Sequence, residues 1–274
     1  MEVSVAHTPD ADDAFMFYGI ASGKLKSRLS VKHVIADIET LNRRAIDHEL
    51  DVTAISAHAY AYLKDYVILK SGGSFGLNYG PIVLSTKEMT RDQLRKARIA
   101  IPGKLTSAYL LLMMAIGKFD AREMPFDIIP DAVDSGKVDA GLVIHEAQIT
   151  FDAKKFFNVL DIGNWWSNET GGLPVPLGVN VASLRSMSRE KVAEFSDLFT
   201  RSIKFGLENV DEAVEYAMRY GRGQSREIIT RFVKMYVNDL TLDMGLQGKK
   251  AIETMFEMAR ERGIIEHRVN FEVL

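Results

Sequence analysis

The sequence predicts an α/β protein, and three observations support this prediction. Short runs of alternating or β-branched residues, each bounded by turn residues, recur through the first two thirds of the chain. Segments with helical periodicity separate several of these runs. The last third contains only helical patterns. Alternation of strand and helix over about 180 residues is typical of sheets with parallel strands and right-handed crossovers.

The expected strands share apolar, partly β-branched composition and flanking turn residues. They cover residues 3–6, 29–36, 52–55, 67–70, 82–85, 98–101, 126–129, 140–144, 159–162 and 178–183. Residues 37–46 between two of them carry apolar side chains on one helical face, with Asp37 as a candidate N-cap. Thr90 and Gln93 have the spacing of a capping box, which predicts a helix start there.

Four helical patterns follow residue 188. They cover residues 189–207, 210–220, 226–238 and 245–262, with turn residues between them. Their apolar stripes, such as Phe195, Leu198, Phe199 and Ile203, need a surface to pack on. We expect these C-terminal helices to cover the back of an existing sheet.

The domain organisation is predicted from two extended segments that Pro and Gly residues introduce. Residues 78–85 and 173–181 have this character, and no flexible linker accompanies them. If the chain crosses between two domains on these segments, the second domain is inserted within the first, and a cleft lies between the two. The predicted large domain comprises residues 1–82 and 181–274, and the predicted inserted domain comprises residues 83–180.

Composition excludes several classes of protein. With 274 residues, 47% of them hydrophobic and 26% charged, the chain resembles an average globular protein. A net charge of −3 makes nucleic acid an unexpected partner. The sequence contains no cysteine, so disulfides, iron–sulfur clusters and cysteine nucleophiles are excluded.

Targeting and cofactor motifs are also missing from the sequence. The longest apolar stretch, residues 108–116, is about half as long as a membrane-spanning helix requires. The N-terminus has no signal-peptide pattern, so we expect a cytoplasmic protein that does not bind membranes. Nucleotide-binding and zinc-binding motifs are absent, and we expect neither a cofactor nor a metal.

Candidate site residues follow three expected strands, because ligands of open parallel sheets bind beyond the carboxyl ends of the strands. Thr106 and Ser107 open an apolar helix and could bind an anion there, although an N-cap role is equally consistent. His145 ends a buried strand and could act as an acid or base, or could serve only in a structural hydrogen bond. Ser56 is interpreted first as a cap and second as a donor to a ligand.

For two further groups of residues, a structural role is favoured over ligand binding. Asp10, Asp12 and Asp13 are more consistent with an acidic helix start than with a hard-cation site. Trp165 and Trp166 are more consistent with closing a core than with stacking on a planar ligand.

Nine short motifs occur in an order that identifies a family resemblance. The chain resembles the 1,4-dihydroxy-6-naphthoate synthases of the futalosine route to menaquinone. The motifs span almost the whole chain: TPDADDAFMFY (from Thr8), DIETLN (from Asp37), SGG (from Ser71), YGP (from Tyr79), PGKLTSAY (from Pro102), AGLVIHE (from Ala140), LDIGNWW (from Leu160), LPVPLG (from Leu173) and YVN (from Tyr236).

The resemblance implies a fold and a reaction. The fold is periplasmic-binding-protein-like (type II): two α/β domains joined by two crossing strands, with the C-terminal helices packed on the first domain. The reaction is that of a carbon–carbon lyase, which converts cyclic dehypoxanthinyl futalosine to 1,4-dihydroxy-6-naphthoate and a three-carbon fragment without metal or nucleotide. The family's proposed proton-abstracting base corresponds to His145.

The resemblance also implies substrate contacts in the cleft. These fall at Ile55, Ser56, Ala57, Ser107 and Ala108. We expect the substrate carboxylate to bind where the helix opens at Thr106 and Ser107. The first loop departs from the family, because Thr8-Pro-Asp-Ala-Asp-Asp stands where Ser-Pro-Cys-Pro-Asn-Asp is common. This departure makes the cleft entrance more acidic.

Three alternatives remain at the level of sequence. The same fold occurs in solute-binding receptors for small carboxylates, in the related chorismate dehydratase and in enzymes of thiamine-precursor synthesis. A receptor would require export, for which the sequence has no signal. The expected partner of this chain is a small-molecule carboxylate substrate. The oligomeric state stays open, with a homodimer as one alternative.

Overall fold

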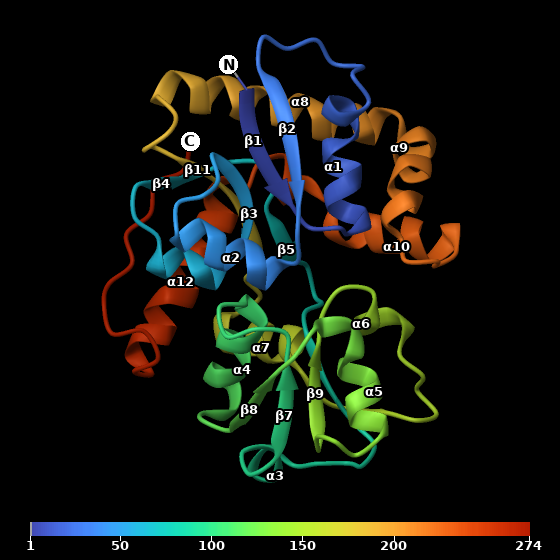
Figure 1. Cartoon of the computed structure of the whole chain (residues 1–274). Helices are drawn as coiled ribbons and strands as arrows, with labels where there is room; N and C mark the ends of the chain where they lie inside the picture. Colours follow the sequence, from blue (N-terminus) through green and yellow to red (C-terminus); the bar gives the residue numbers. More distant parts are fainter. Residues whose placement is uncertain (1) are drawn as a thin grey trace. The chain divides into compact units, whose positions relative to one another are not determined.

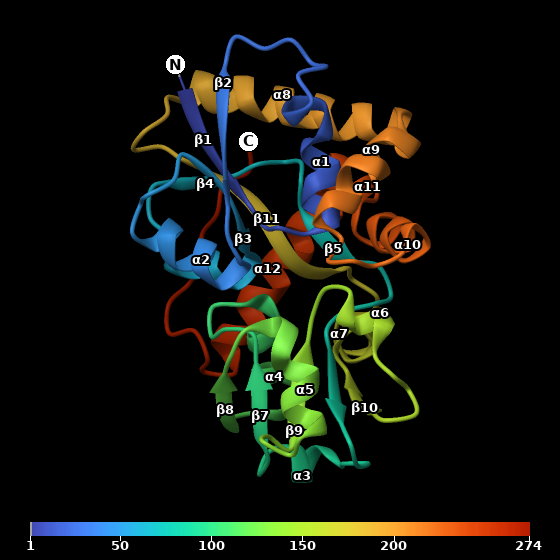
Figure 2. The same ribbon diagram turned by 45° about the vertical axis from the view of Figure 1, so that its right-hand side comes forward.

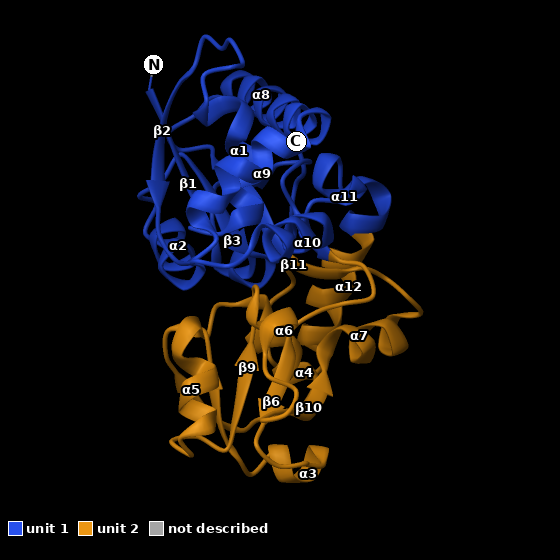
Figure 3. Ribbon diagram, turned by 90° about the vertical axis from the view of Figure 1, so that its right-hand side faces the viewer, with its two compact units in different colours: residues 1–75, 178–249, 270–274 blue, residues 76–177, 250–269 orange. Residues whose placement is uncertain are grey.

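The chain forms two compact units, coloured separately in Figure 3. The computed structural model describes residues 2–274. Unit 1 comprises residues 1–75, 178–249 and 270–274, and unit 2 comprises residues 76–177 and 250–269. The chain passes from one unit to the other within strand β5 (Ser74–Gly76) and within strand β11 (Val175–Ser183), which pair with each other. It passes between the units twice more, within helix α12 (Gly245–Glu261) and after residue 269.

Unit 1 contains a mixed sheet in the order β2-β1-β3-β11-β4, with β5 beside β11. Its first strands are β1 (Glu2–His7), β2 (Ser30–Ile35) and β3 (Val52–Ser56), which are parallel to one another. β11 runs antiparallel to β3 and to β4 (Tyr66–Ile68). The sequence predicts parallel strands only. β11 differs because it enters unit 1 from unit 2, and therefore needs no crossover helix to reach its neighbour.

Helices cover both faces of this sheet. Helix α2 (Ile38–Ile46) packs on one face, where Leu41 joins Ala6 and Ala54 in a buried cluster. Helix α1 (Ala11–Ala21) contacts α8 (Arg189–Glu208), and the rings of Phe17 and Phe199 stack at a centroid distance of 4.4 Å. Figure 1 shows α8, in orange, passing behind β1 and β2.

Further short helices complete unit 1. They are η1 (Ala57–Tyr62), α9 (Val210–Ala217), η3 (Met218–Tyr220), α10 (Arg226–Tyr236) and α11 (Asp239–Leu242). The four helical patterns expected after residue 188 correspond to α8, to α9 with η3, to α10 and to α12 (Gly245–Glu261).

Unit 2 contains a second mixed sheet in the order β10-β6-β9-β7-β8. The strands are β6 (Ile82–Ser85), β7 (Arg98–Ile101), β8 (Asp120–Glu123), β9 (Ala140–Val143) and β10 (Phe157–Asp161). Helices α3 (Arg91–Leu94), α4 (Ser107–Ile116), α5 (Ile129–Asp134), α6 (Ala147–Thr150) and α7 (Ile162–Thr170) connect them. The expected capping box of Thr90 and Gln93 is present at the start of α3.

One expected strand is wrong. Residues 126–129 form the short helical turn η2 (Phe126–Ile128) and the first residue of α5, and the strand of this region is β8 instead. Ile129, Ala132 and Val133 are buried together, which is the i, i+3, i+4 spacing of a helix. Pro130 stands in the first turn of α5, where its missing N–H has no cost.

Trp165 and Trp166 lie on α7. Both are buried, and the indole N–H of Trp166 donates to the Pro174 carbonyl over 3.0 Å. The interpretation of this pair as a structural core is confirmed. The guanidinium of Arg262 lies 5.5 Å from the Trp165 ring centroid and pairs with Glu169 over 2.8 Å. These contacts explain why residues 250–269, which the sequence assigns to the large domain, belong to unit 2.

No helix within residues 2–274 is both long enough and apolar enough to span a membrane.

Candidate active site

Ser56 ends strand β3 in unit 1 and is held by the buried amide of Asn42. The backbone N–H of Ser56 donates to Asn42 Oδ1 over 2.8 Å, and Asn42 Nδ2 donates to Ser56 Oγ over 3.1 Å. Although Ser56 precedes η1, its side chain makes no capping hydrogen bond. The favoured interpretation of Ser56 as a cap is therefore wrong. Its neighbours Ile55 and Ala57 are fully buried, so their side chains pack in the core of unit 1.

Thr106 is the N-cap of α4 in unit 2. Its Oγ1 accepts from the Tyr109 N–H over 3.2 Å and donates to the Gly103 carbonyl over 2.7 Å. One lone pair and the hydroxyl proton are thus engaged in the cap. The structure confirms the N-cap role, in which Thr106 holds the start of α4 in place.

Ser107 and Ala108 form the first turn of α4 and are nearly buried. Ser107 Oγ donates to the Leu177 carbonyl over 2.6 Å, so its proton is directed to the backbone. The N–H groups at the first positions of an α-helix have no partner within the helix, and they carry the positive end of the helix dipole. The start of α4 therefore favours a carboxylate.

His145 follows β9 in a left-handed backbone conformation, with φ of 55°. Its ring is half-buried and meets the Phe126 ring edge to face, with centroids 4.8 Å apart. A non-glycine residue in the left-handed region is uncommon and strained, and such residues concentrate at functional sites. A half-buried imidazole remains accessible to a substrate, which a general base requires.

The sheet of unit 2 brings these two segments to one edge. β7 and β9 are parallel neighbours, side by side in Figures 1 and 2, so their carboxyl ends meet at the same edge. α4 follows β7, and His145 follows β9. In unit 1, the parallel strands β1 and β3 likewise carry the first loop and Ser56 to one edge.

The acidic first loop is engaged by protein groups. Asp13 Oδ2 accepts from the backbone N–H of Thr8 over 2.8 Å and from its hydroxyl over 2.6 Å. Burial raises the pKa of Asp13. Asp10 pairs with Arg222. The loop leads into α1, as the favoured interpretation of an acidic helix start predicts.

Two histidines of unit 1 form a pair that the sequence did not reveal. His7 Nε2 and His33 Nδ1 lie 3.2 Å apart, and His7 stacks on Phe17. Burial, together with the neighbouring His7, lowers the pKa of His33 to about 4. The two residues are 26 positions apart and become neighbours only through the pairing of β1 with β2. The only indication of this pair in the sequence is that each of two expected neighbouring parallel strands carries, or ends next to, a histidine.

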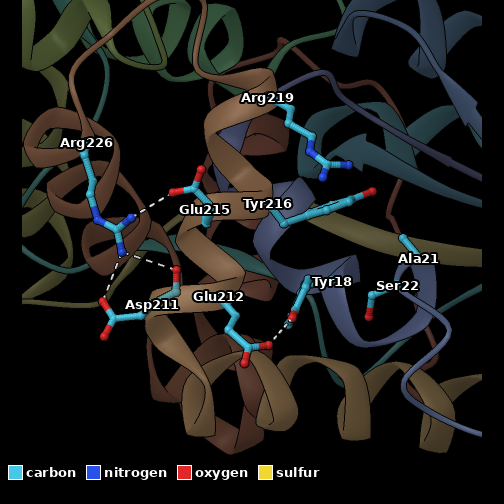
Figure 4. Close-up of a pocket in the computed structure, with 9 residues that line it drawn as sticks. All are labelled: Tyr18, Ala21, Ser22, Asp211, Glu212, Glu215, Tyr216, Arg219 and Arg226. Carbon is cyan, nitrogen blue, oxygen red and sulfur yellow. Dashed lines mark hydrogen bonds and ion pairs between the residues drawn. The ribbon is translucent and has the colours of Figure 1, made fainter.

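A surface groove of unit 1 is lined by several charged side chains. Figure 4 shows this groove of about 610 Å³ between α1 and α9, with three acidic residues on the α9 side. Arg226 pairs with Asp211 and Glu215, and the Tyr18 hydroxyl donates to Glu212 over 2.6 Å. Glu212 also pairs with Lys24, so each of the three carboxylates has a cationic partner in the protein.

Comparison with known proteins shows the family. A family model described as menaquinone biosynthesis matches residues 3–261. A curated 1,4-dihydroxy-6-naphthoate synthase of Thermus thermophilus is 36% identical over 94% of this chain and 93% of its own. The protein of the same name from Streptomyces coelicolor is 32% identical over 96% of this chain and 94% of its own.

Solved structures agree with these relatives. Protein AF1704 of Archaeoglobus fulgidus is 50% identical, with a TM-score of 0.92 over 96% of this chain and 98% of its own. The alkanesulfonate-binding protein SsuA of Xanthomonas axonopodis pv. citri has a TM-score of 0.73 at 14% identity, over 98% of this chain and 95% of its own. The latter likeness concerns the fold alone, and it confirms the expected periplasmic-binding-protein-like class. The chain therefore belongs to the menaquinone-biosynthesis family that includes the 1,4-dihydroxy-6-naphthoate synthases.

Proposed function

We propose that this protein is a 1,4-dihydroxy-6-naphthoate synthase. Its reaction would convert cyclic dehypoxanthinyl futalosine to 1,4-dihydroxy-6-naphthoate and a three-carbon fragment by cleavage of a carbon–carbon bond. The observation that carries the proposal is the match to curated synthases over more than nine tenths of the chain. The strained, accessible His145 at a strand end supports it.

His145 has the role of the general base in this proposal. The neutral imidazole removes a proton from the substrate, and loss of that proton drives bond cleavage. The product is aromatic, so much of the driving force comes from aromatisation. The ring of His145 is half-buried, which leaves it accessible to a substrate.

The substrate carboxylate binds at the start of α4. The N–H groups of Ser107 and Ala108, together with the helix dipole, supply the attraction, and Thr106 keeps this first turn formed. Anchoring the carboxylate places the rest of the substrate near the carboxyl end of β9, because β7 and β9 are adjacent. Such positioning converts proton transfer into an intramolecular step.

Ser56 contributes a contact from unit 1. Its hydroxyl hydrogen-bonds to the substrate, and Ile55 and Ala57 shape the backbone around it. The absence of a capping role for Ser56 supports this assignment, since its hydroxyl serves no local purpose at η1.

Incubation of the purified protein with cyclic dehypoxanthinyl futalosine tests the proposal. We expect release of a fluorescent naphthoate whose mass matches 1,4-dihydroxy-6-naphthoate. Chorismate is tested in parallel, because chorismate dehydratase shares the fold. Turnover of chorismate in place of the futalosine derivative would replace the proposal with the dehydratase. Binding of the derivative without turnover would identify a solute-binding receptor.

The location of the protein separates the synthase from the receptor as well. We propose a cytoplasmic location, in which a biosynthetic enzyme meets its substrate. Fractionation of cells that express the native gene would detect it in the cytoplasmic fraction, whereas recovery from the cell envelope would favour the receptor.

A further inference from the structure

Asn42, 14 positions before Ser56 in the sequence, forms hydrogen bonds with the backbone N–H and with the hydroxyl oxygen of Ser56. Asn42 is fully buried on α2. A backbone N–H can only donate, so the Asn42 atom 2.8 Å from Ser56 N is the oxygen, and the atom 3.1 Å from Ser56 Oγ is the nitrogen. The orientation of this amide therefore follows from its partners.

The orientation of the amide determines the role of the Ser56 hydroxyl. Because Asn42 Nδ2 donates, Ser56 Oγ must accept, and its own proton points elsewhere. Within residues 2–274, the side chain of Ser56 has no hydrogen-bond partner other than Asn42, and it does not cap η1. A nearly buried hydroxyl proton is costly to leave without an acceptor, so a ligand is the natural recipient.

We propose that Asn42 is a positioning residue that makes Ser56 a hydrogen-bond donor to the substrate. The inference rests on the proposed function and deepens it. Ser56 then recognises an oxygen that carries a lone pair, such as a carboxylate, carbonyl or ether oxygen. Asn42 Nδ2 uses one of the two lone pairs of Ser56 Oγ, so the hydroxyl proton is the group left to bind an acceptor of the substrate.

The Asn42→Asp variant reverses this polarity with almost no change in shape. An ionised carboxylate accepts from the Ser56 N–H as before, but it also accepts the Ser56 hydroxyl proton. Ser56 then presents a lone pair to the substrate oxygen. At neutral pH we expect KM to rise by about tenfold or more, with kcat within about twofold of wild type, because a binding contact is lost and the base is intact.

Lowering the pH should restore binding in this variant. The introduced carboxyl, once protonated, donates to Ser56 Oγ as the amide does, and burial moves its titration to higher pH. The ratio of the variant's KM to the wild-type KM should therefore fall toward one as the pH falls. Taking the ratio removes the pH dependence that both proteins share. A merely structural role of Asn42 would leave the ratio independent of pH.

Asn209→Asp is the matched control. Asn209 also lies in unit 1, and its Nδ2 donates to the Phe205 carbonyl over 2.9 Å, far along the chain from the candidate site. The same chemical change there should leave KM at the wild-type value at every pH.

A cycle of alanine variants covers the case in which Asn42→Asp does not fold. If Asn42 acts through Ser56, then Asn42→Ala raises KM in the wild-type background but not in the Ser56→Ala background. Equal effects of Asn42→Ala in both backgrounds would overturn the inference.

The outcomes separate this inference from the proposed function. Absence of turnover by the wild-type protein overturns both. Turnover by the wild type with an unchanged KM in Asn42→Asp at every pH overturns the positioning role alone. A raised ratio that falls with decreasing pH supports it.

Discussion

Two junctions between a strand and a helix place a hydroxyl at the same point but use it differently. β3 leads through Ser56 into η1, and β7 leads through a short turn and Thr106 into α4. Thr106 caps its helix by accepting from the Tyr109 N–H. Ser56 caps nothing, because Asn42 holds both its N–H and its oxygen.

The difference shows that the position of a serine or threonine before a helix does not decide its role. Local rules favour capping at both junctions. At Ser56 a buried amide from α2 takes the place of the local partner, and because this amide donates, the hydroxyl proton points away from it. A hydroxyl that does not cap its own helix is free to form a hydrogen bond with a ligand. The partner that releases it comes from a distant part of the sequence.

The largest effect is expected at a third junction between a strand and a helix, which runs from β9 through His145 to α6. Here an imidazole occupies the strand end, and we assign it the chemical step. Replacing His145 with Asn, which tolerates the left-handed backbone, should lower kcat by about a hundredfold or more. KM should change little, because the binding junctions are intact. Steady-state kinetics of naphthoate release would measure both constants, and a kcat near the wild-type value would remove His145 from the mechanism.

The histidine pair at the end of β1 limits the pH range in which the Ser56 junction can be studied. His33 has a pKa of about 4 in the folded protein, below its ordinary value of 6.5, so the unfolded chain binds its proton more tightly. Its contribution to stability is therefore complete above about pH 6.5 and is lost as the pH falls toward 4.

This loss can be measured against a variant without the titrating group. His33 is half-buried, and the loss should amount to about 1–2 kcal/mol after allowance for solvent. His33→Asn can still donate to His7 Nε2 but does not titrate in this range. Denaturant unfolding from pH 7 to pH 4.5 should show a smaller loss of stability for the variant. Parallel losses in both proteins would rule out His33 as the source.

The smallest expected effect concerns the capping junction. Thr106→Ala removes the cap of α4 and should lower the free energy of unfolding by about 1 kcal/mol. In a thermal melt this corresponds to a decrease of about 2–4 °C in Tm. Thr106→Ser keeps an Oγ in the same position and should melt close to the wild type. If both variants melt equally early, the hydroxyl is not the stabilising group.

Much of the fold was predictable because it depends on local patterns. Most strands followed from apolar alternation, and the helices after residue 188 from their apolar stripes. Residues 126–129 misled because a short apolar run fits a strand as well as a buried helix turn. β8 was missed because its sequence, Asp-Ala-Arg-Glu, is polar and largely exposed. The antiparallel placement of β11 depends on the path of the chain between units, which no local pattern reports.

The candidate site was predictable in part. Strand ends identified Ser56, Thr106, Ser107 and His145 as residues worth attention. The left-handed backbone of His145 left no signal in the sequence, because that conformation is usually adopted by Gly and only a small share of other residues adopt it. The hydrogen bonds between Asn42 and Ser56 could not be predicted either, because they form only when α2 packs against β3. Sequence therefore located the candidate groups, and the structure assigned the direction of their hydrogen bonds.

Chemical rescue of the strand-end base is the most direct test of the proposed reaction. Glycine adopts a φ of 55° without strain, so His145→Gly removes the imidazole and preserves the backbone. Product formation by this variant should be slow and should increase with the concentration of added imidazole, by about tenfold or more near saturation. A variant that binds the futalosine derivative but gains no rate from imidazole, or one that turns over as fast as wild type without it, would contradict the account.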